Sequence, residues 1–258
     1  MANRILRRGT NWLIKHVLDP GVKRFGFDIV VSTPPDFSED EMEIIRRVRP
    51  FTMSSPERIV TMIHAVRYVV ENNVPGAIVE CGVWRGGSIM IALLVLMKMG
   101  RTDRDVYLYD TFSGMTAPTE KDIVLDGRSA ADLLKQETRK PSANIWAWAT
   151  REDVTQNVLS TAYPKDRIHL VEGDVLKTIP ATSPAQIALL RLDTDWYEST
   201  KHELLHLYPC LSRSGVLIID DYGWWKGARK AVDEYFGEQP FRPLLHRIDF
   251  TGRCLIKV

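Results

Sequence analysis

The chain has 258 residues, and its 34 basic and 33 acidic side chains leave a formal net charge of +1. This balance excludes the strongly basic surface field that is typical of many nucleic-acid-binding proteins. The three cysteines, Cys81, Cys210 and Cys254, form neither a zinc-binding spacing nor a disulfide framework, which suits a reducing cytoplasm. The longest apolar run, residues 89–97, is about half of what crosses a bilayer. We therefore expect a cytoplasmic protein with no membrane insertion and no nucleic-acid partner.

Residues 1–50 are expected to form a helical extension ahead of a main domain at residues 51–258. In residues 1–35, basic side chains are interspersed with apolar ones, a pattern typical of an amphipathic helix. Such a helix packs on the body of the protein or on another subunit, covers an active site as a lid, or attaches to a membrane surface. The packed helix is the favoured interpretation, and it is consistent with a homo-oligomer.

Two helix starts and then a strand–helix alternation follow along the chain. Residues 38–41 form a capping box for a helix that runs to about Val48, and residues 54–57 begin a second helix. From Ala77 onward, apolar runs alternate with helical patterns. We expect strands at 77–81, 105–109, 168–171, 187–192 and 215–220, helices at 87–99, 151–160, 197–210 and 227–236, and a final hairpin of strands at about 244–249 and 252–257. This order predicts an α/β fold with a doubly wound, mostly parallel sheet and a C-terminal antiparallel hairpin.

Residues 113–150 interrupt this alternation with a long insertion. A compact α/β fold needs only a short connection there, and long insertions are often lids or binding loops. The alternative is a plain surface excursion. Two tryptophans, Trp146 and Trp148, favour the lid.

The first three strands end in residues suited to binding a small polar ligand. Glu80 precedes a glycine-rich turn at residues 82–87, which allows a ligand to approach backbone N–H groups closely. The spacing is not that of a dinucleotide-binding turn, and no phosphate-binding loop is present. Asp110 ends the second strand, where nucleotide-binding α/β folds hold a ribose diol, and Asp174 follows the third. Each acid alone is equally well explained as a helix cap. Together they predict a nucleoside-like ligand without phosphates.

The next two strands each end in a pair of carboxylates: Asp193 with Asp195, and Asp220 with Asp221. Taken separately, each pair is explained equally well by acids that cap the next helix. If the strands are neighbours, four carboxylates meet at one edge of the sheet, and a cation, a shared proton or solvent must offset their charge. A hard divalent metal is the simplest explanation.

Four sequence blocks together resemble one enzyme family. They are Glu80–Ser88 (ECGVWRGGS), Tyr109–Met115 (YDTFSGM), Arg191–Thr200 (RLDTDWYEST) and Ile218–Gly223 (IIDDYG). In this order they resemble the macrocin O-methyltransferase family, whose members methylate sugar hydroxyls on macrolide and aminocoumarin antibiotics. The resemblance extends from about residue 50 to the C-terminus. It implies a class I, Rossmann-like methyltransferase fold that binds S-adenosylmethionine, with Mg²⁺ at the acceptor site.

The resemblance also implies roles for individual residues. Those around the cofactor are Glu80, Gly82 and Ser88 at the methionine portion, Asp110 at the ribose, and Asp174 with Val175 at the adenine. The implied metal ligands are Asp193, Asp220 and Asp221, and the implied general base is Asp195. Adjacent residues of a strand point to opposite sides, so Asp220 and Asp221 need not both bind the metal.

We therefore expect a Mg²⁺-dependent O-methyltransferase that acts on a hydroxyl of a small molecule, with a sugar of a glycosylated natural product as the favoured acceptor. A methyltransferase for catechols or other small molecules would share the same chemistry. A binding protein that keeps the cofactor fold without turnover is the remaining alternative. Trp224 and Trp225, which follow the last acidic pair, either wall the acceptor pocket or pack in the core.

Overall fold

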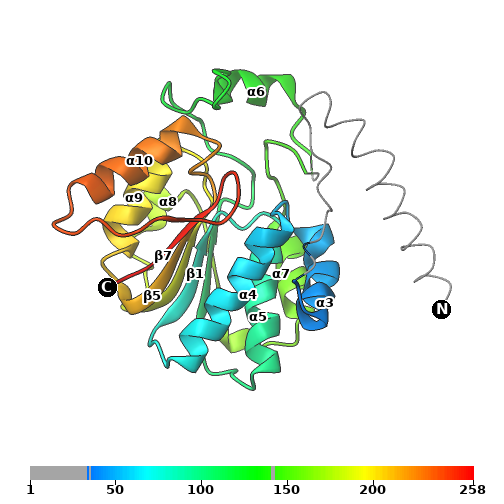
Figure 1. Cartoon of the computed structure of the whole chain (residues 1–258). Coiled ribbons are helices and arrows are strands. Elements are labelled where there is room, and N and C mark those ends of the chain that lie inside the picture. The colour runs from blue at the N-terminus through cyan, green and yellow to red at the C-terminus, as the bar shows by residue number, and fades with distance from the viewer. Residues whose placement is uncertain (1–33, 35, 141–142) are drawn as a thin grey trace, which may run out of the picture. The chain divides into compact units, whose positions relative to one another are not determined.

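A sheet of seven strands organises the part of the chain that the structure, a computed structural model, describes (residues 34, 36–140 and 143–258; Figure 1). The strands are β1 (Ala77–Cys81), β2 (Val106–Asp110), β3 (Ile168–Glu172), β4 (Ile187–Leu192), β5 (Leu211–Ile219), β6 (His246–Arg247) and β7 (Arg253–Ile256). Their order is β3-β2-β1-β4-β5-β7-β6. β1 to β5 pair in parallel, and β7 pairs antiparallel with β5 and β6. The predicted doubly wound sheet with an antiparallel end is confirmed.

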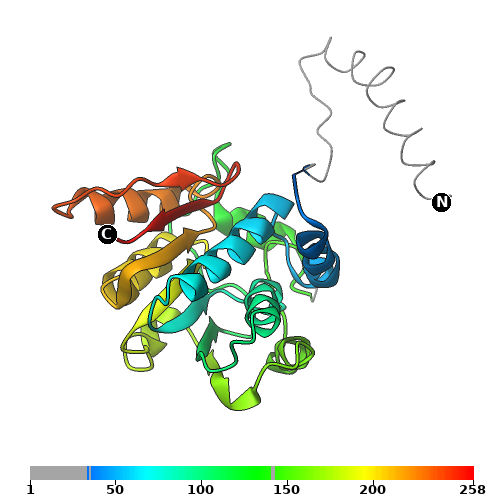
Figure 2. The same ribbon diagram turned by 60° about the horizontal axis from the view of Figure 1, so that its bottom comes forward.

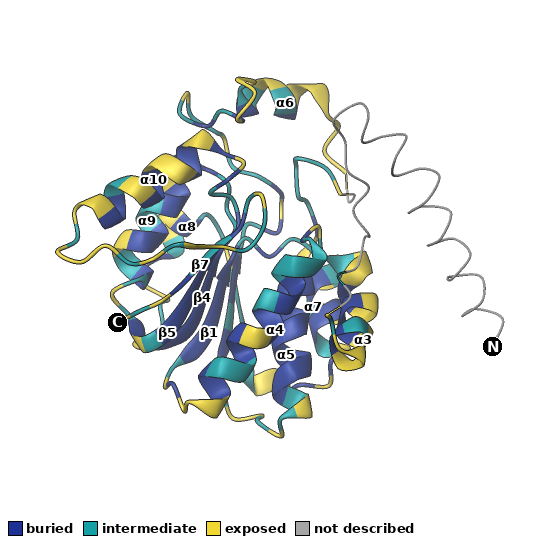
Figure 3. Cartoon of the chain, viewed as in Figure 1, coloured by how far each residue is buried: buried dark blue, intermediate teal, exposed yellow. Residues whose placement is uncertain are grey.

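Helices cover both faces of this sheet (Figures 1 and 2). On one side lie α3 (Glu39–Val48), α4 (Pro56–Glu71), α5 (Gly87–Lys98) and α7 (Arg151–Leu159), and on the other α8 (Val175–Thr178), α9 (Tyr197–Leu207) and α10 (Lys226–Gly237). Short 3-10 turns, η2 (Arg49–Phe51) and η3 (Lys165–Arg167), complete the two layers. Every residue of β1 and β4 is buried between them, which explains why these strands are continuous apolar runs (Figure 3).

The helix starts predicted from the sequence are confirmed. α3 begins at Glu39 and ends at Val48. α4 begins at Pro56, and the side chain of Ser55 accepts a hydrogen bond from the backbone N–H of Arg58 as its N-cap. The predicted amphipathic helix in residues 1–35 lies almost wholly outside the described residues. Of the described helices, none is long and apolar enough to cross a membrane.

Three predicted elements have an end that is wrong by two or more residues. α9 stops at Leu207 rather than at residue 210, because Pro209 has no backbone N–H to donate to the preceding turn of the helix. β5 begins at Leu211, four residues before the predicted start, because its ladder to β4 contains a register shift. β6 has only two residues, since Asp249 Oδ1 accepts hydrogen bonds from the N–H groups of Thr251 and Gly252 and draws the chain into a turn.

The first half of the insertion is fixed to the body of the protein. The indole N–H of Trp196 donates to the carbonyl of Thr116 (3.1 Å), and the buried Asp122 accepts from the backbone N–H of Tyr197 (2.7 Å), the first residue of α9. Asp122 thus caps a helix that has no side-chain cap of its own. The backbone of Val124 also pairs with that of Trp225. The insertion continues into α6 (Ala130–Gln136), which lies above the carboxyl ends of the strands in Figure 1.

Candidate active site

The strand order reverses between β1 and β4, and ligands of such sheets bind beyond the carboxyl ends of the strands at that point. Two pockets lie there. Pocket A, of about 230 Å³, is lined by Gly82, Asp110, Asp174, Val175, Trp196 and neighbouring residues. Pocket B, of about 580 Å³, is lined by Ser88, Asp220, Asp221, Trp224, Trp225, residues of the insertion and others. The two pockets share Met53, Trp84, Asp193 and Asp195.

Gly82 explains how the ends of β1 and β4 come together at pocket A. Its φ is +79°, and a Cβ added to it would lie 1.9 Å from the backbone oxygen of Asp193. The backbone N–H of Asp193 in turn donates to the carbonyl of Cys81 (2.9 Å). Only glycine allows this close approach.

Asp110 organises the turn on the other side of pocket A. Its carboxylate accepts hydrogen bonds from the backbone N–H groups of Val83 (2.7 Å), Trp84 (3.1 Å) and Phe112 (2.7 Å). Burial raises the pKa of Asp110, and these hydrogen bonds oppose that rise. The carboxyl group also lines the pocket, so a ligand there would contact it. Trp84 takes a φ of +46°, which is unusual for an aromatic residue and places it at the wall between the pockets.

The other predicted ligand-binding residues do not all line the same pocket. Val175 lines pocket A, as does Asp174, which also accepts a hydrogen bond from the N–H of Leu176 as the N-cap of α8. Ser88 lines pocket B instead. Glu80 lines neither pocket, because its side chain is 1% exposed and pairs with Arg191. Burial raises the pKa of Glu80 to about 7, even though the arginine opposes that rise.

Three carboxylates form a cluster where the two pockets meet. Asp193, Asp195 and Asp221 each offer an oxygen atom, and these atoms all lie within 4.8 Å of one another. Asp195 takes a φ of +67°, which reverses the chain after β4, and its N–H donates to Asp221 Oδ2 (3.3 Å). Aspartate tolerates this left-handed conformation better than most residues.

The electrostatics of the cluster favour a cation. Burial, reinforced by Asp193, raises the pKa of Asp195 to about 7. Burial also raises the pKa of Asp193 and that of Asp221 well above the usual range, although Arg191 opposes the rise at Asp193. Three converging carboxylate oxygens are the hard ligands that Mg²⁺ prefers, so the residues fit such an ion.

Asp220 lines pocket B but differs from its neighbour in the charges that it contacts. Its Oδ1 accepts a hydrogen bond from Arg191 Nη2 (2.6 Å), and its Oδ2 pairs with Arg58. Asp221, one residue further along, faces the cluster instead. The structure thus brings Asp195, rather than Asp220, together with the two other predicted metal ligands, Asp193 and Asp221.

Two arginines pair with the carboxylates of the site, and neither was predicted as a site residue from the sequence. Arg191 is 4% exposed, and its guanidinium contacts Glu80, Asp193 and Asp220. Arg58 on α4 pairs with Asp220 and, through Nε, with Asp249 (3.0 Å). An arginine within the apolar run of β4 was the available signal, because a buried guanidinium requires carboxylate partners.

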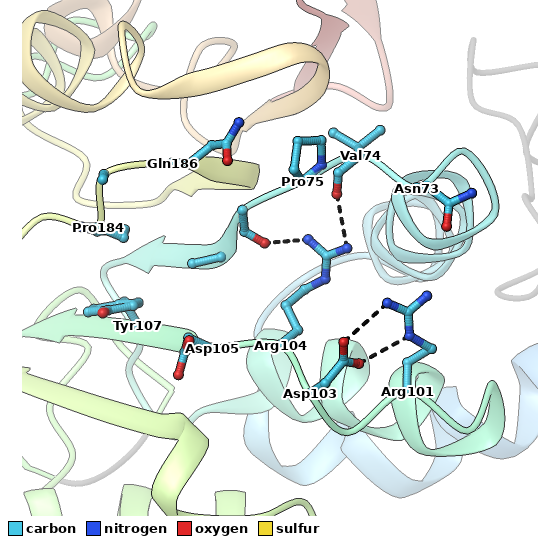
Figure 4. A pocket seen from close by; sticks show the side chains of 13 residues that line it. Asn73, Val74, Pro75, Arg101, Asp103, Arg104, Asp105, Tyr107, Pro184 and Gln186 are labelled. Atoms are coloured by element: carbon cyan, nitrogen blue, oxygen red, sulfur yellow. Dashed lines mark hydrogen bonds and ion pairs between the residues drawn. The ribbon is translucent and has the colours of Figure 1, made fainter.

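A third pocket, of about 490 Å³, lies at the opposite edge of the sheet, where β1, β2 and β4 begin (Figure 4). Its two arginines are already engaged. Arg101 Nε pairs with Asp103 Oδ1 (3.1 Å), and Arg104 donates to the carbonyl groups of Val74 (3.0 Å) and Gly76. These contacts hold neighbouring loops together. The arginines of this pocket therefore have a structural role, and we assign the pocket no ligand.

Comparisons with known proteins agree with this geometry. Residues 40–257 match the family model described as macrocin O-methyltransferase. The chain is 31% identical over 201 residues to demethyldecarbamoylnovobiocin O-methyltransferase of Streptomyces niveus, a match that covers 78% of this chain and 73% of that protein. It is 33% identical, with the same coverage, to 8-demethyl-8-(2,3-dimethoxy-alpha-L-rhamnosyl)-tetracenomycin-C 4'-O-methyltransferase of Streptomyces olivaceus.

A solved structure supports the same assignment. The O-methyltransferase NovP is similar to this chain with a TM-score of 0.70 and 30% identity, over 80% of this chain and 82% of that one. The predicted fold and enzyme class are thereby confirmed. The chain belongs to the macrocin O-methyltransferase family and is an S-adenosylmethionine-dependent O-methyltransferase.

Proposed function

We propose that this enzyme holds S-adenosylmethionine in pocket A and a sugar hydroxyl of a glycosylated small molecule in pocket B, with Mg²⁺ at the carboxylate cluster. The observation that carries the proposal is that Asp193 and Asp195 line both pockets. Methyl transfer requires the acceptor oxygen in line with the sulfonium methyl group, so the two ligands must meet at a shared wall. The negative charge at this wall also suits a cationic sulfonium.

In this proposal, Asp193 and Asp221 bind the metal and Asp195 accepts the proton of the acceptor hydroxyl. When bound, Mg²⁺ supplies a Lewis acid that lowers the pKa of a coordinated hydroxyl. Asp195 suits the role of general base because its carboxyl group lies beside Asp193 and Asp221 and lines both pockets. The family resemblance implies that Asp220 is also a ligand. Its two arginine partners favour a different role, in which it orients Arg191 beneath Asp193.

The residues of pocket A support the cofactor assignment. Gly82 lines this pocket where the ends of β1 and β4 meet, and Asp110 lines it at the end of β2, the position where this fold class holds a ribose diol. Asp174 and Val175 form the far wall and would contact the adenine. Glu80 lines neither pocket, so it would act on the cofactor through Arg191 and the turn at Gly82 rather than by direct contact.

Pocket B has the mixed lining that a sugar requires. Trp84 and Trp224 present aromatic surface, the buried Trp225 packs behind it, and Arg128 and Asn144 of the insertion add polar groups. Aromatic rings pack against the apolar faces of a sugar, and polar groups fix its hydroxyls. The tetracenomycin relative is named for methylation at a rhamnosyl group, which favours the same acceptor class here.

Two measurements test this proposal. Calorimetry should show that S-adenosylhomocysteine binds, and methyl transfer from labelled S-adenosylmethionine should occur with glycosylated natural products but not with their sugar-free cores. Excess EDTA should abolish transfer. Equal activity on the sugar-free cores would favour a phenol or catechol acceptor, and full activity in EDTA would remove the metal from the mechanism.

We also propose that the enzyme is a homo-oligomer. The basic and apolar pattern of residues 1–35 supports this, because an amphipathic helix commonly packs against another subunit. Light scattering of the full chain and of a chain lacking residues 1–35 tests the idea. A monomeric mass for the full chain would overturn it.

A further inference from the structure

Glu203 is a buried carboxyl group for which fold stability offers no reason. It lies on α9 and is 0% exposed. Its Oε1 accepts a hydrogen bond from the hydroxyl of Thr194 (2.9 Å), and the thiol of Cys81 is its other polar neighbour, while Oε2 has no hydrogen-bond partner. Burial raises the pKa of Glu203 to about 8, so the group is largely neutral at pH 7.

A carboxyl group in this position is costly. Burial of a polar group with an unpaired oxygen is unfavourable, and a well-packed apolar side chain in its place is often neutral or stabilising. The residue that Glu203 contacts therefore gives the reason for its presence. That residue is Thr194, which lies between Asp193 and Asp195 in the chain.

The turn formed by Asp193, Thr194 and Asp195 needs support, because Asp195 takes the left-handed conformation. The carbonyl of Thr194 already accepts hydrogen bonds from the N–H of Trp196 (2.7 Å) and the hydroxyl of Ser199 (3.4 Å). These contacts hold the backbone of Thr194. The hydrogen bond to Glu203 holds its side chain against α9.

We propose that Glu203 is a positioning residue, which acts through the hydroxyl of Thr194 to fix the turn that carries Asp193 and Asp195. The consequence for metal binding rests on the proposed function, whereas the effect on the turn does not. Glutamine at position 203 would keep the oxygen that accepts from Thr194. Leucine would fill the same space and remove that acceptor, so the pair of variants isolates the hydrogen bond.

The test compares Glu203→Gln with Glu203→Leu, and Thr194→Ser with Thr194→Val, in the full chain saturated with S-adenosylhomocysteine. The first readout is hydrogen–deuterium exchange in the peptide that covers residues 190–197. The second is the Kd for Mn²⁺, used as a paramagnetic probe for Mg²⁺. Loss of a group that orients a metal ligand typically weakens metal binding by about 10- to 100-fold.

Glu203→Leu and Thr194→Val should each speed exchange and weaken Mn²⁺ binding by about tenfold, and the double variant should be no worse than either one. Glu203→Gln and Thr194→Ser should match the wild type. If Glu203 is a positioning residue, Glu203→Leu must differ from Glu203→Gln in exchange rate and in Mn²⁺ affinity. This holds even if Glu203→Leu raises the Tm.

Wild-type exchange in both Glu203→Leu and Thr194→Val would overturn the inference. If the wild type binds no Mn²⁺, the metal in the proposed function is wrong, and the exchange data still decide the role of Glu203. If Glu203→Leu does not fold, Thr194→Val decides it, because Thr194 is partly exposed and valine matches its shape.

Discussion

The backbone oxygen of Asp193 lies against the α-carbon of Gly82, so close that a single methyl group on the glycine would sit 1.9 Å from it. This contact joins the turn after β1, which lines pocket A, to the end of β4, which carries the carboxylate cluster. Pocket A and the cluster therefore share one rigid backbone junction. Their geometry cannot be varied independently.

Replacement of Gly82 by alanine should destabilise the protein and weaken S-adenosylhomocysteine binding, because the backbone of Asp193 must move. The matched control is Gly100→Ala, since Gly100 has a similar positive φ (+67°) but nothing within 4 Å of its added Cβ. The control should cost about 1–2 kcal/mol, which is the conformational penalty alone. Urea unfolding and calorimetry measure both effects. Equal losses in the two variants would show that the contact with Asp193 does not matter.

Asp221→Asn and Asp220→Asn should differ in their effect on metal binding. Asp221 faces the cluster, so its loss should raise the Kd for Mn²⁺ strongly. Asp220→Asn should chiefly lower the Tm, because it leaves Arg191 and Arg58 short of a buried partner. Titration with Mn²⁺ and thermal melts of both variants test this. Comparable metal affinities in the two variants would make Asp220 a direct ligand.

Metal affinity should rise with pH through about 7. Burial raises the pKa of Asp195 to about 7, and those of Asp193 and Asp221 lie well above their usual range. Below these values the cluster carries protons that a metal ion must displace. The Kd for Mn²⁺ should therefore fall between pH 6 and pH 8, by up to about tenfold per pH unit for each proton released.

Calorimetry in buffers of different ionisation enthalpy should detect that proton release directly. Asp195→Asn is the control, since it removes one of the titrating groups and should flatten the pH dependence. A Kd that does not change between pH 6 and pH 8 would contradict the raised pKa values.

Glu203→Gln should stabilise the protein increasingly as the pH rises. The pKa of Glu203 is about 8 in the folded protein, compared with 4.5 for the free group. Between these values the folded state binds more protons than the unfolded state, so the wild type loses stability as the pH increases. The neutral glutamine has no such loss. The difference in Tm between variant and wild type should be small at pH 5 and larger at pH 8.

Glu198→Gln is the comparison for that experiment, because Glu198 lies on the same helix with its side chain 47% exposed. Comparison of the two variants separates the effect of burial at Glu203 from the general effect of replacing a glutamate of α9. A constant difference for Glu203→Gln would mean that the buried carboxyl ionises as it does in water.

The fold class and the residue types at the strand ends could be predicted without the structure. The apolar runs of β1 and β4 are continuous because both faces of a parallel sheet are covered. Such a run can be recognised within the strand's own residues, without knowledge of its neighbours. Gly82 and Asp110 were identified for the same reason, since each directly follows or ends a predicted strand. Four sequence blocks were enough to indicate the family, which the comparisons confirm.

Which charges pair could not be predicted and depends on how the chain packs. Asp220 and Asp221 are neighbours in the chain, yet one contacts Arg58, 162 residues away, and the other joins the carboxylate cluster. Nothing in the sequence distinguishes Glu203 from the other polar residues of α9, and only its contact with Thr194 does so. The energy of a buried charge depends on the groups that packing brings around it, and those partners come from distant parts of the chain. Local sequence patterns therefore place the acids at the site, while packing assigns each acid its partner.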